Sequence, residues 1–305
     1  MVAEIPLLCV VGPTASGKTH LAVRLANIVD GEILSADSRQ VYRYMDIGTG
    51  KDLDEYIVDG KQIPYHLIDI VDAGYQYSIY EYQRDFMAAY HDVLDREKIP
   101  ILCGGSGMYI DAVLGNYRLE HVPTNEQFRK DAENMTMEEL QEMLKQNTTL
   151  HNTTDTTHRE RLLKAVEIAL YYAENPPKEK DPIPYKLFYV DFERPVLKGR
   201  IALRLHERLK NGLIDEVEFL MQEGISGEDL SYYGMEYRFA VQYLNKEIDL
   251  KTMEIKLFHA IGRLAKRQKT WFNRMRNQGY QFIDIDGTLS DEQKLNRILL
   301  AMKQP

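Results

Sequence analysis

Short apolar runs alternate with longer amphipathic segments along the first 115 residues of the chain. The apolar runs hold few polar residues, as is typical of strands buried on both faces of a sheet. Between these runs, apolar positions recur at helical steps, which indicates amphipathic helices. This alternation predicts a parallel sheet covered by helices. The predicted strands are 6–11, 32–36, 66–70 and 99–103, and the predicted helices are 17–29 and 78–97.

The pattern changes after residue 114. The following segment is polar and helical, and it ends in a run of Asn and Thr too poor in apolar residues to pack. A helix at 159–172 and a strand at 187–192 then resume the alternation, and we expect this strand to be the last of the sheet. A long amphipathic helix at 250–276 dominates the remainder. We therefore divide the chain into a first part of the α/β core at 1–114, an inserted helical subdomain at 115–158, and the completion of the core with C-terminal helices at 159–305.

Composition limits the class of protein. The chain has 305 residues, 44% of them hydrophobic, which is enough for an enzyme-sized core. Its two cysteines, Cys9 and Cys103, lie in apolar runs without the spacing of a zinc site, so we expect no structural metal. The apolar run before Val11 is too short to span a membrane and lacks the basic leader of a signal peptide. We expect a cytoplasmic protein without a membrane partner.

The net charge of -9 argues at first against a nucleic-acid partner. The charge is unevenly distributed, however. Residues 255–280 contain no Asp or Glu but seven Lys and Arg residues. In the predicted helix these basic residues lie opposite the apolar positions, so they form one basic face. A binding surface for nucleic acid is therefore compatible with the acidic total.

Residues 12–19 read Gly-Pro-Thr-Ala-Ser-Gly-Lys-Thr, which completes the loop G-x-x-x-x-G-K-[ST] between a predicted strand and a predicted helix. In such loops, backbone N–H groups and the start of the helix hold phosphate groups, as in proteins that bind ATP. We expect Lys18 to add a full positive charge, and the Thr19 hydroxyl to hold Mg²⁺. The predicted fold is therefore a P-loop NTPase-like parallel sheet flanked by helices, with a small helical insertion and a helical C-terminal part. The expected phosphate-binding residues are Gly12, Pro13, Thr14, Ala15, Ser16, Gly17, Lys18 and Thr19.

Two further segments end predicted strands at the same edge of the sheet. Asp37 follows the second strand, where it is either a site residue or the N-cap of a helix, with Gln40 completing a capping box. Residues 104–107, Gly-Gly-Ser-Gly, follow another strand. Their N–H groups and the Ser106 hydroxyl can face the same crevice, but a turn that requires positive φ explains the glycines equally well.

Several motifs together resemble the tRNA dimethylallyltransferases, also called tRNA isopentenyltransferases. They occur in the expected order and span most of the chain. Besides the P-loop they are Asp-Ser-Arg-Gln-Val-Tyr-Arg at 37–43, Met-Asp-Ile-Gly-Thr-Gly-Lys at 45–51, His-Leu-Ile-Asp at 66–69, Gly-Gly-Ser-Gly-Met-Tyr at 104–109, Arg-Leu-Leu-Lys-Ala-Val-Glu at 161–167 and Ala-Lys-Arg-Gln-Lys-Thr-Trp-Phe at 265–272.

The resemblance implies a reaction. The family transfers a dimethylallyl group from dimethylallyl diphosphate to N6 of adenosine 37, beside the tRNA anticodon, and releases diphosphate. The P-loop then holds the diphosphate rather than ATP, together with Mg²⁺, and Arg200 and Arg204 match family arginines near that group. Asp37 becomes the candidate general base, acting with Lys18 and Thr19.

The resemblance also implies an RNA surface that binds the anticodon stem-loop, and it makes the inserted segment at 115–158 an RNA-binding subdomain. We expect the protein to be a monomer. The expected tRNA contacts are Asp37, Ser38, Arg39, Gln40, Ser106, Arg161, Lys164, Arg238, Arg263, Lys266 and Arg267. This chain departs from the family pattern where Glu236 precedes Tyr237 and Arg238, and its insertion is short. Two other functions remain open from the residues alone: a small-molecule P-loop kinase and a non-catalytic RNA-binding protein.

Overall fold

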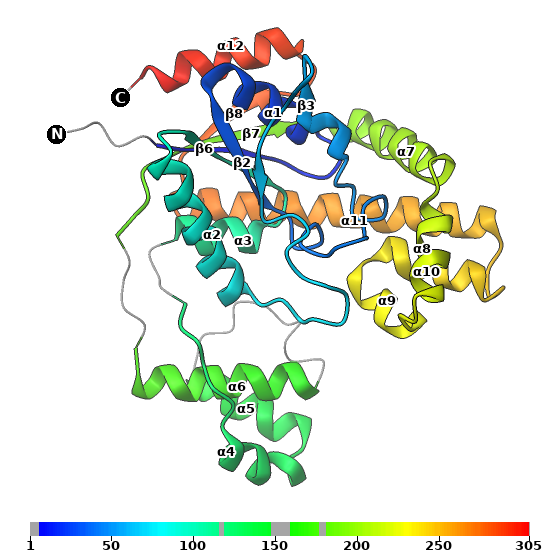
Figure 1. Ribbon diagram of the computed structural model, residues 1–305. Helices are drawn as coiled ribbons and strands as arrows, with labels where there is room; N and C mark the ends of the chain where they lie inside the picture. Colours follow the sequence, from blue (N-terminus) through cyan, green and yellow to red (C-terminus); the bar gives the residue numbers. More distant parts are fainter. Residues whose placement is uncertain (1–5, 116–118, 148–158, 177–180, 305) are drawn as a thin grey trace. The chain divides into compact units, whose positions relative to one another are not determined.

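The computed structural model of the protein describes residues 6–115, 119–147, 159–176 and 181–304. Contacts divide the chain into two compact units. The first combines Met1–Gly115 with Ile183–Pro305, and the second is Asn116–Pro182. Figure 1 shows the strands and most of the helices in the first unit.

The first unit is built on a six-stranded sheet in the order β5-β2-β6-β1-β7-β8, in which every neighbouring pair is parallel. Strands β1 and β2 are fully buried, as expected for a sheet covered on both faces. β1 is entirely apolar, whereas β2 also holds the buried Glu32 and Ser35. The strands are β1 (Leu7–Val11), β2 (Gly31–Ala36), β5 (Tyr65–His66), β6 (Ile99–Gly104), β7 (Tyr185–Asp191) and β8 (Phe282–Asp286).

Helices cover the two faces of this sheet with separate apolar clusters. On one face, Leu8 and Val10 of β1 pack with α1 (Lys18–Val29) and α12 (Asp291–Met302). On the other, Leu7 and Cys9 pack with three helices. The alternation along β1 therefore sends successive side chains into opposite layers. The three helices are α2 (Ile79–Asp95), α3 (Gly107–Leu114) and α11 (Leu250–Asn277).

A third apolar cluster joins α11 to the helices that precede it in the sequence. Pro195 lies in the first turn of the first of these helices, where its missing N–H costs nothing. Gly212 separates that helix from the next with a φ of 99°. These helices are α7 (Arg194–Lys210), α8 (Leu213–Gln222), α9 (Gly227–Tyr233) and α10 (Met235–Leu244).

The second unit is a small helical bundle around Phe128, Leu140 and Leu162. It contains α4 (Glu126–Asp131), the 3₁₀ turn η2 (Ala132–Asn134), α5 (Met137–Asn147) and α6 (Arg159–Glu174). The sequence pattern predicts α6 as part of the core, but its apolar stripe packs on α5 within this unit. Most of the run of Asn and Thr lies outside the described residues.

The predicted fold class is confirmed, and two strands differ from expectation. The strand expected at 66–70 ends at His66, because Leu67 and Asp69 have φ angles of 65° and 57°, which no strand accommodates. The strand ending at Asp191 is not the last, because β8 pairs beyond it. In β8 polar and apolar residues alternate, which is the pattern of a partly exposed edge strand. Within the described residues, no helix is both long and apolar enough to cross a membrane.

Candidate active site

The P-loop connects β1 to α1 at the carboxyl edge of the sheet. Gly17 occupies the N-cap with a φ of 77° and offers no side chain, and the first turn of α1 carries no acidic residue. The N–H groups at this helix start are therefore available to an anion, which the partial positive charge of the helix also attracts. The loop has the local structure predicted for a phosphate site.

Lys18 and Thr19 begin α1 and face inward. The Lys18 ammonium lies 3.4 Å from the carbonyl oxygen of Pro13. Burial, reinforced by the nearby Arg204, lowers the pKa of Lys18, so its charge is poorly compensated by the protein alone. Burial raises the pKa of the Cys103 thiol to about 12, and its hydrogen bond with Thr19 only partly offsets this.

Gln268 of α11 ties the P-loop to the neighbouring strand. Its Oε1 accepts a hydrogen bond of 2.8 Å from the Thr14 N–H, and its Nε2 donates one of 3.0 Å to the Gly105 carbonyl. One amide side chain thus fixes the distance between the loops that follow β1 and β6. Sequence reasoning missed this residue, although it lies inside the Lys-Arg-Gln-Lys motif.

Asp37 follows β2 directly. Its Oδ1 accepts a hydrogen bond of 3.0 Å from the Arg39 N–H, which closes a turn of the Asx type. No helix begins there, so the N-cap interpretation is wrong. Gln40, the supposed capping partner, is buried; it accepts from the Ser35 hydroxyl and donates to the Gly50 carbonyl. The Asx turn leaves the second carboxylate oxygen of Asp37 without a protein partner among the described residues.

The turn after β6 contacts Ser38, the residue that follows Asp37. Ser106 Oγ accepts a hydrogen bond of 3.1 Å from the Ser38 N–H. The glycines of this turn do not have positive φ, so that explanation is wrong. They are required by close approach, since a Cβ at Gly105 would lie 2.6 Å from Gln268 Nε2, and one at Gly107 would collide with Trp271.

Helix α7 brings arginines to the other side of the P-loop. Arg200 Nε donates a hydrogen bond of 2.7 Å to the Ala15 carbonyl. Arg204 forms an ion pair with Asp52. Burial alone would raise the pKa of Asp52, but Arg204 and the neighbouring Arg208 lower it, so the carboxylate stays charged.

Glu216 of α8 holds the loop that precedes Asp52. Its two oxygens accept hydrogen bonds from the N–H groups of Asp46, Ile47 and Gly48, at 2.9, 2.6 and 3.0 Å. The Tyr237 hydroxyl adds a fourth at 2.8 Å. This carboxylate positions the loop from a distant helix, which no local sequence pattern indicates.

Two cavities meet at the P-loop. The Asp37 cavity, of about 230 Å³, is lined by residues after β2 and β6 and from α9, α10 and α11. The P-loop cavity, of about 380 Å³, is lined by the P-loop, Asp52, Glu55 and α7. The two cavities share four lining residues, which are Lys18, Thr19, Arg204 and Arg208. The phosphate-binding end of the site and Asp37 therefore line adjoining cavities that share these side chains.

The residues predicted to contact RNA fall in several places. Five of these predicted residues line the Asp37 cavity together with Asp37, and so does Glu236. Burial raises the pKa of Glu236, and Arg208 only partly offsets this. Arg238 is exposed on α10, with its guanidinium 4.7 Å from the centre of the Phe239 ring. The five predicted residues that line the Asp37 cavity are Ser38, Arg39, Gln40, Ser106 and Arg267.

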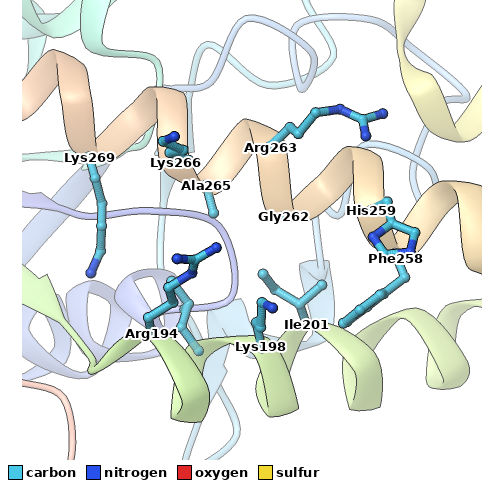
Figure 2. Close-up of a pocket in the computed structure, with 11 residues that line it drawn as sticks. Arg194, Lys198, Ile201, Phe258, His259, Gly262, Arg263, Ala265, Lys266 and Lys269 are labelled. Atoms are coloured by element: carbon cyan, nitrogen blue, oxygen red, sulfur yellow. The ribbon is translucent and has the colours of Figure 1, made fainter.

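Arg263 and Lys266 line a different hollow, a groove of about 590 Å³ between α7 and α11. Figure 2 shows Arg194, Lys198 and Ile201 rising from α7, while Phe258 points down from α11. The basic face predicted for α11 is thus divided, because Arg267 turns to the Asp37 cavity instead.

Arg161 and Lys164 belong to α6 of the second unit. Arg161 is exposed, whereas the Lys164 ammonium donates a hydrogen bond of 2.8 Å to the Val122 carbonyl. Lys164 also lies 3.6 Å from Glu167. Of the two, Arg161 has the side chain more available for a ligand.

Fold and site together define a P-loop protein with a carboxylate beside its phosphate loop. Residues 40–275 match the family described as IPP transferase. The tRNA dimethylallyltransferase 1 of Parabacteroides distasonis is 47% identical over 291 residues, covering 95% of each chain. That of Syntrophus aciditrophicus is 50% identical over 285 residues, covering 92% of this chain and 93% of the other. The chain belongs to the IPP transferase family, and the resemblance seen in the sequence is confirmed.

Solved structures agree with this assignment. The full-length tRNA isopentenylpyrophosphate transferase from Bacillus halodurans matches with a TM-score of 0.69 and 29% identity, covering 98% of this chain and 96% of the other. A eukaryotic dimethylallyltransferase acting on tRNA shares the fold, with a TM-score of 0.78 at 20% identity, over 97% of this chain and 77% of that one.

Proposed function

We propose that this protein transfers a dimethylallyl group from dimethylallyl diphosphate to N6 of adenosine 37, next to the anticodon of a tRNA. The observation that carries the proposal is the junction of the two cavities. The P-loop lines one cavity and Asp37 the other, and the two cavities share Lys18, Thr19, Arg204 and Arg208. Family membership supports the same reaction.

The diphosphate rests on the P-loop, residues 12–19. The N–H groups at the start of α1 and the ammonium of Lys18 bind its oxygens, and Arg200 and Arg204 add charge from α7. As the allylic C–O bond breaks, negative charge grows on the departing oxygen. Because these donors are already in place, they stabilise that charge without reorganising.

Asp37 takes the proton. N6 attacks the allylic carbon, the C–O bond breaks with its electron pair leaving on diphosphate, and the proton lost by N6 passes to Asp37. The Asx turn orients the carboxylate by one oxygen and leaves the other for N6. Because an aryl amine is a weak nucleophile, holding N6 in line with the allylic carbon contributes more than basicity does.

Thr19 is the residue that would hold Mg²⁺ at the phosphate end of the site. It lines both cavities, whereas the described residues hold no cluster of three His, Cys, Asp or Glu that could bind a metal alone. Mg²⁺ commonly takes one or two protein oxygens and completes its shell with phosphate oxygens and water. A Mg²⁺ ion held there would supply positive charge that neutralises the diphosphate.

The RNA approaches from the Asp37 cavity, which has to admit an adenine that has left its stack. Ser38, Arg39, Gln40, Ser106 and Arg267 line this cavity and surround the base. Backbone phosphates meet the outer basic residues, which are Arg161, Lys164, Arg238, Arg263 and Lys266. A monomeric state and a cytoplasmic location stay predictions from the sequence.

The reaction is tested directly with radiolabelled dimethylallyl diphosphate and unmodified tRNA. We expect label in the tRNA, and none in a matched tRNA with guanosine at position 37, which lacks the N6 amine. A small-molecule kinase is the alternative. ATP-dependent phosphorylation of a metabolite, without label in tRNA, would overturn the proposal, and RNA binding without either reaction would indicate a non-catalytic protein.

A further inference from the structure

Arg208 is a half-buried cation without a partner among the described residues. It lies in the last turn of α7 and lines both the Asp37 cavity and the P-loop cavity. Its Nε is shielded from solvent and makes no hydrogen bond. Among the described residues, its guanidinium forms no ion pair within 4.0 Å either. A shielded donor of a charged group left in this state is costly, so it requires an explanation.

The other basic residues at this junction have protein partners. The Lys18 ammonium contacts the Pro13 carbonyl, and Arg204 is paired with Asp52. The acidic groups that act on Arg208 are Asp52, Glu236 and Asp37, and none of them forms an ion pair with it. Asp52 is already engaged by Arg204. In the part of the chain that the structure describes, no carboxylate is therefore paired with Arg208.

The local backbone is adapted to keep the guanidinium there. Gly50 has a φ of 65°, and a Cβ at this position would collide with Arg208 and come within 2.9 Å of Arg204. Glu216 fixes the same loop through the N–H groups of residues 46–48. A glycine and a clamped loop thus make room for the Arg208 side chain, which argues against an accidental position.

Electrostatics agree with the geometry. Burial, followed by repulsion from Arg204, lowers the pKa of Arg208, so its charged form is destabilised in the free protein. An anion bound where the two cavities meet would stabilise the charged form of Arg208 and so reverse the lowering of its pKa. The P-loop, which binds the anion in the proposed function, lines the same two cavities.

We propose that Arg208 is a ligand of the diphosphate, contacting it from the side that faces the Asp37 cavity. The proposal rests on the proposed function for the identity of the anion, and it adds a residue that the motifs did not indicate. Because Arg208 lies where the two cavities meet, its charge is directed at the oxygen that departs from the allylic carbon. It therefore contributes to binding and to stabilisation of the leaving group.

Binding of inorganic diphosphate tests this without the transfer reaction. Isothermal titration in the presence of Mg²⁺ would compare the wild type with Arg208→Met, which keeps the length of the side chain and removes the charge. Lys210→Met is the matched control, because Lys210 is an exposed basic residue in the same last turn of α7 and lines neither cavity. We expect binding about tenfold or more weaker for Arg208→Met, and a change of less than about twofold for Lys210→Met.

Thermal unfolding separates this role from a structural one. Removing an unpaired, half-buried charge should leave the unfolding temperature unchanged or raise it. Arg208→Lys, which retains a charge but not the forked donors, should bind diphosphate with intermediate affinity. Wild-type affinity in Arg208→Met would overturn the proposal. A lower unfolding temperature in both Arg208→Met and Arg208→Lys, together with equal losses of diphosphate affinity, would overturn it too. Failure of the proposed reaction would instead appear as absence of label transfer by the wild type.

Discussion

The side chain of Gln268 accepts a 2.8 Å hydrogen bond from the backbone N–H of Thr14, across 254 positions of sequence. Its amide donor simultaneously holds the Gly105 carbonyl. The same side chain therefore sets both the shape of the phosphate loop and its distance from the turn that carries Ser106. Precise placement of this kind is what allows fixed N–H groups to stabilise a leaving group.

Replacing Gln268 by Leu should loosen the P-loop. Both hydrogen bonds are lost, and the Thr14 N–H and the Gly105 carbonyl are left without their partner. We expect the free energy of unfolding to fall by about 1–3 kcal/mol and the affinity for inorganic diphosphate to fall about tenfold. Calorimetry and thermal unfolding measure these changes. Gln278→Leu, at the exposed end of the same helix, is the control and should change neither.

Asp37→Asn separates basicity from geometry. Asparagine retains an oxygen for the Arg39 N–H, so the Asx turn persists, but it accepts no proton from N6. We expect the turnover number to fall by about 10² or more, with diphosphate affinity unchanged. Asp37→Ala should show a similar loss of turnover. Wild-type turnover by the Asn variant would assign Asp37 a purely structural role in the turn.

The pH dependence of diphosphate binding should report Lys18. Burial lowers the pKa of Lys18, so the ammonium that binds the anion is lost at a lower pH than an exposed lysine would be. Affinity should therefore decline as the pH rises through this lowered pKa, by up to about tenfold per unit of pH beyond it.

The comparison is Lys18→Arg, because a guanidinium stays protonated over the accessible range. Inorganic diphosphate itself changes protonation state with pH, and this affects its binding to both proteins equally. Only the difference between the two pH profiles therefore reports the protonation of Lys18. Identical pH profiles would exclude Lys18 as the titrating group.

Glu167 should stabilise the second unit. It is 2% exposed and accepts hydrogen bonds from Arg129 at 3.0 and 3.1 Å, and from the Asn125 N–H at 3.0 Å. Glu167→Ala leaves Arg129 without its buried partner but still paired with the exposed Glu160, and should cost about 1–3 kcal/mol. Hydrogen exchange in α4 and α5 measures this loss. Glu160→Ala removes an exposed partner of the same arginine and should cost about 1 kcal/mol or less.

The same carboxylate predicts acid sensitivity. Burial alone would raise the pKa of Glu167, but the hydrogen bonds from Arg129 and Asn125 outweigh it and lower the pKa below its usual range. Its contribution to stability is thus complete above the pKa of an unfolded glutamate, and is lost as the pH falls through the lowered value. In Glu167→Gln this part of the acid dependence of the second unit should be absent.

Much of the architecture follows from local pattern. Apolar runs and helical periodicity predicted the sheet and the long helix α11, because burial on two faces and a 3.6-residue repeat leave direct marks on the sequence. β8 was missed, since an edge strand of alternating acidic and apolar residues has a weaker pattern than a buried one. The early end of β5 was missed because the left-handed φ angles of Leu67 and Asp69 are imposed by the surrounding structure.

For the site, the sequence alone determined the P-loop at 12–19 and the position of Asp37 at the carboxyl edge of the sheet. Loop chemistry and strand order suffice for both. The tertiary structure decided that Asp37 closes an Asx turn, that Gln268 and Glu216 hold the neighbouring loops, and that the Arg208 guanidinium lies between two cavities. These contacts join residues far apart in the chain. Their identity depends on which side chains the packed helices bring together, and no local spacing encodes that.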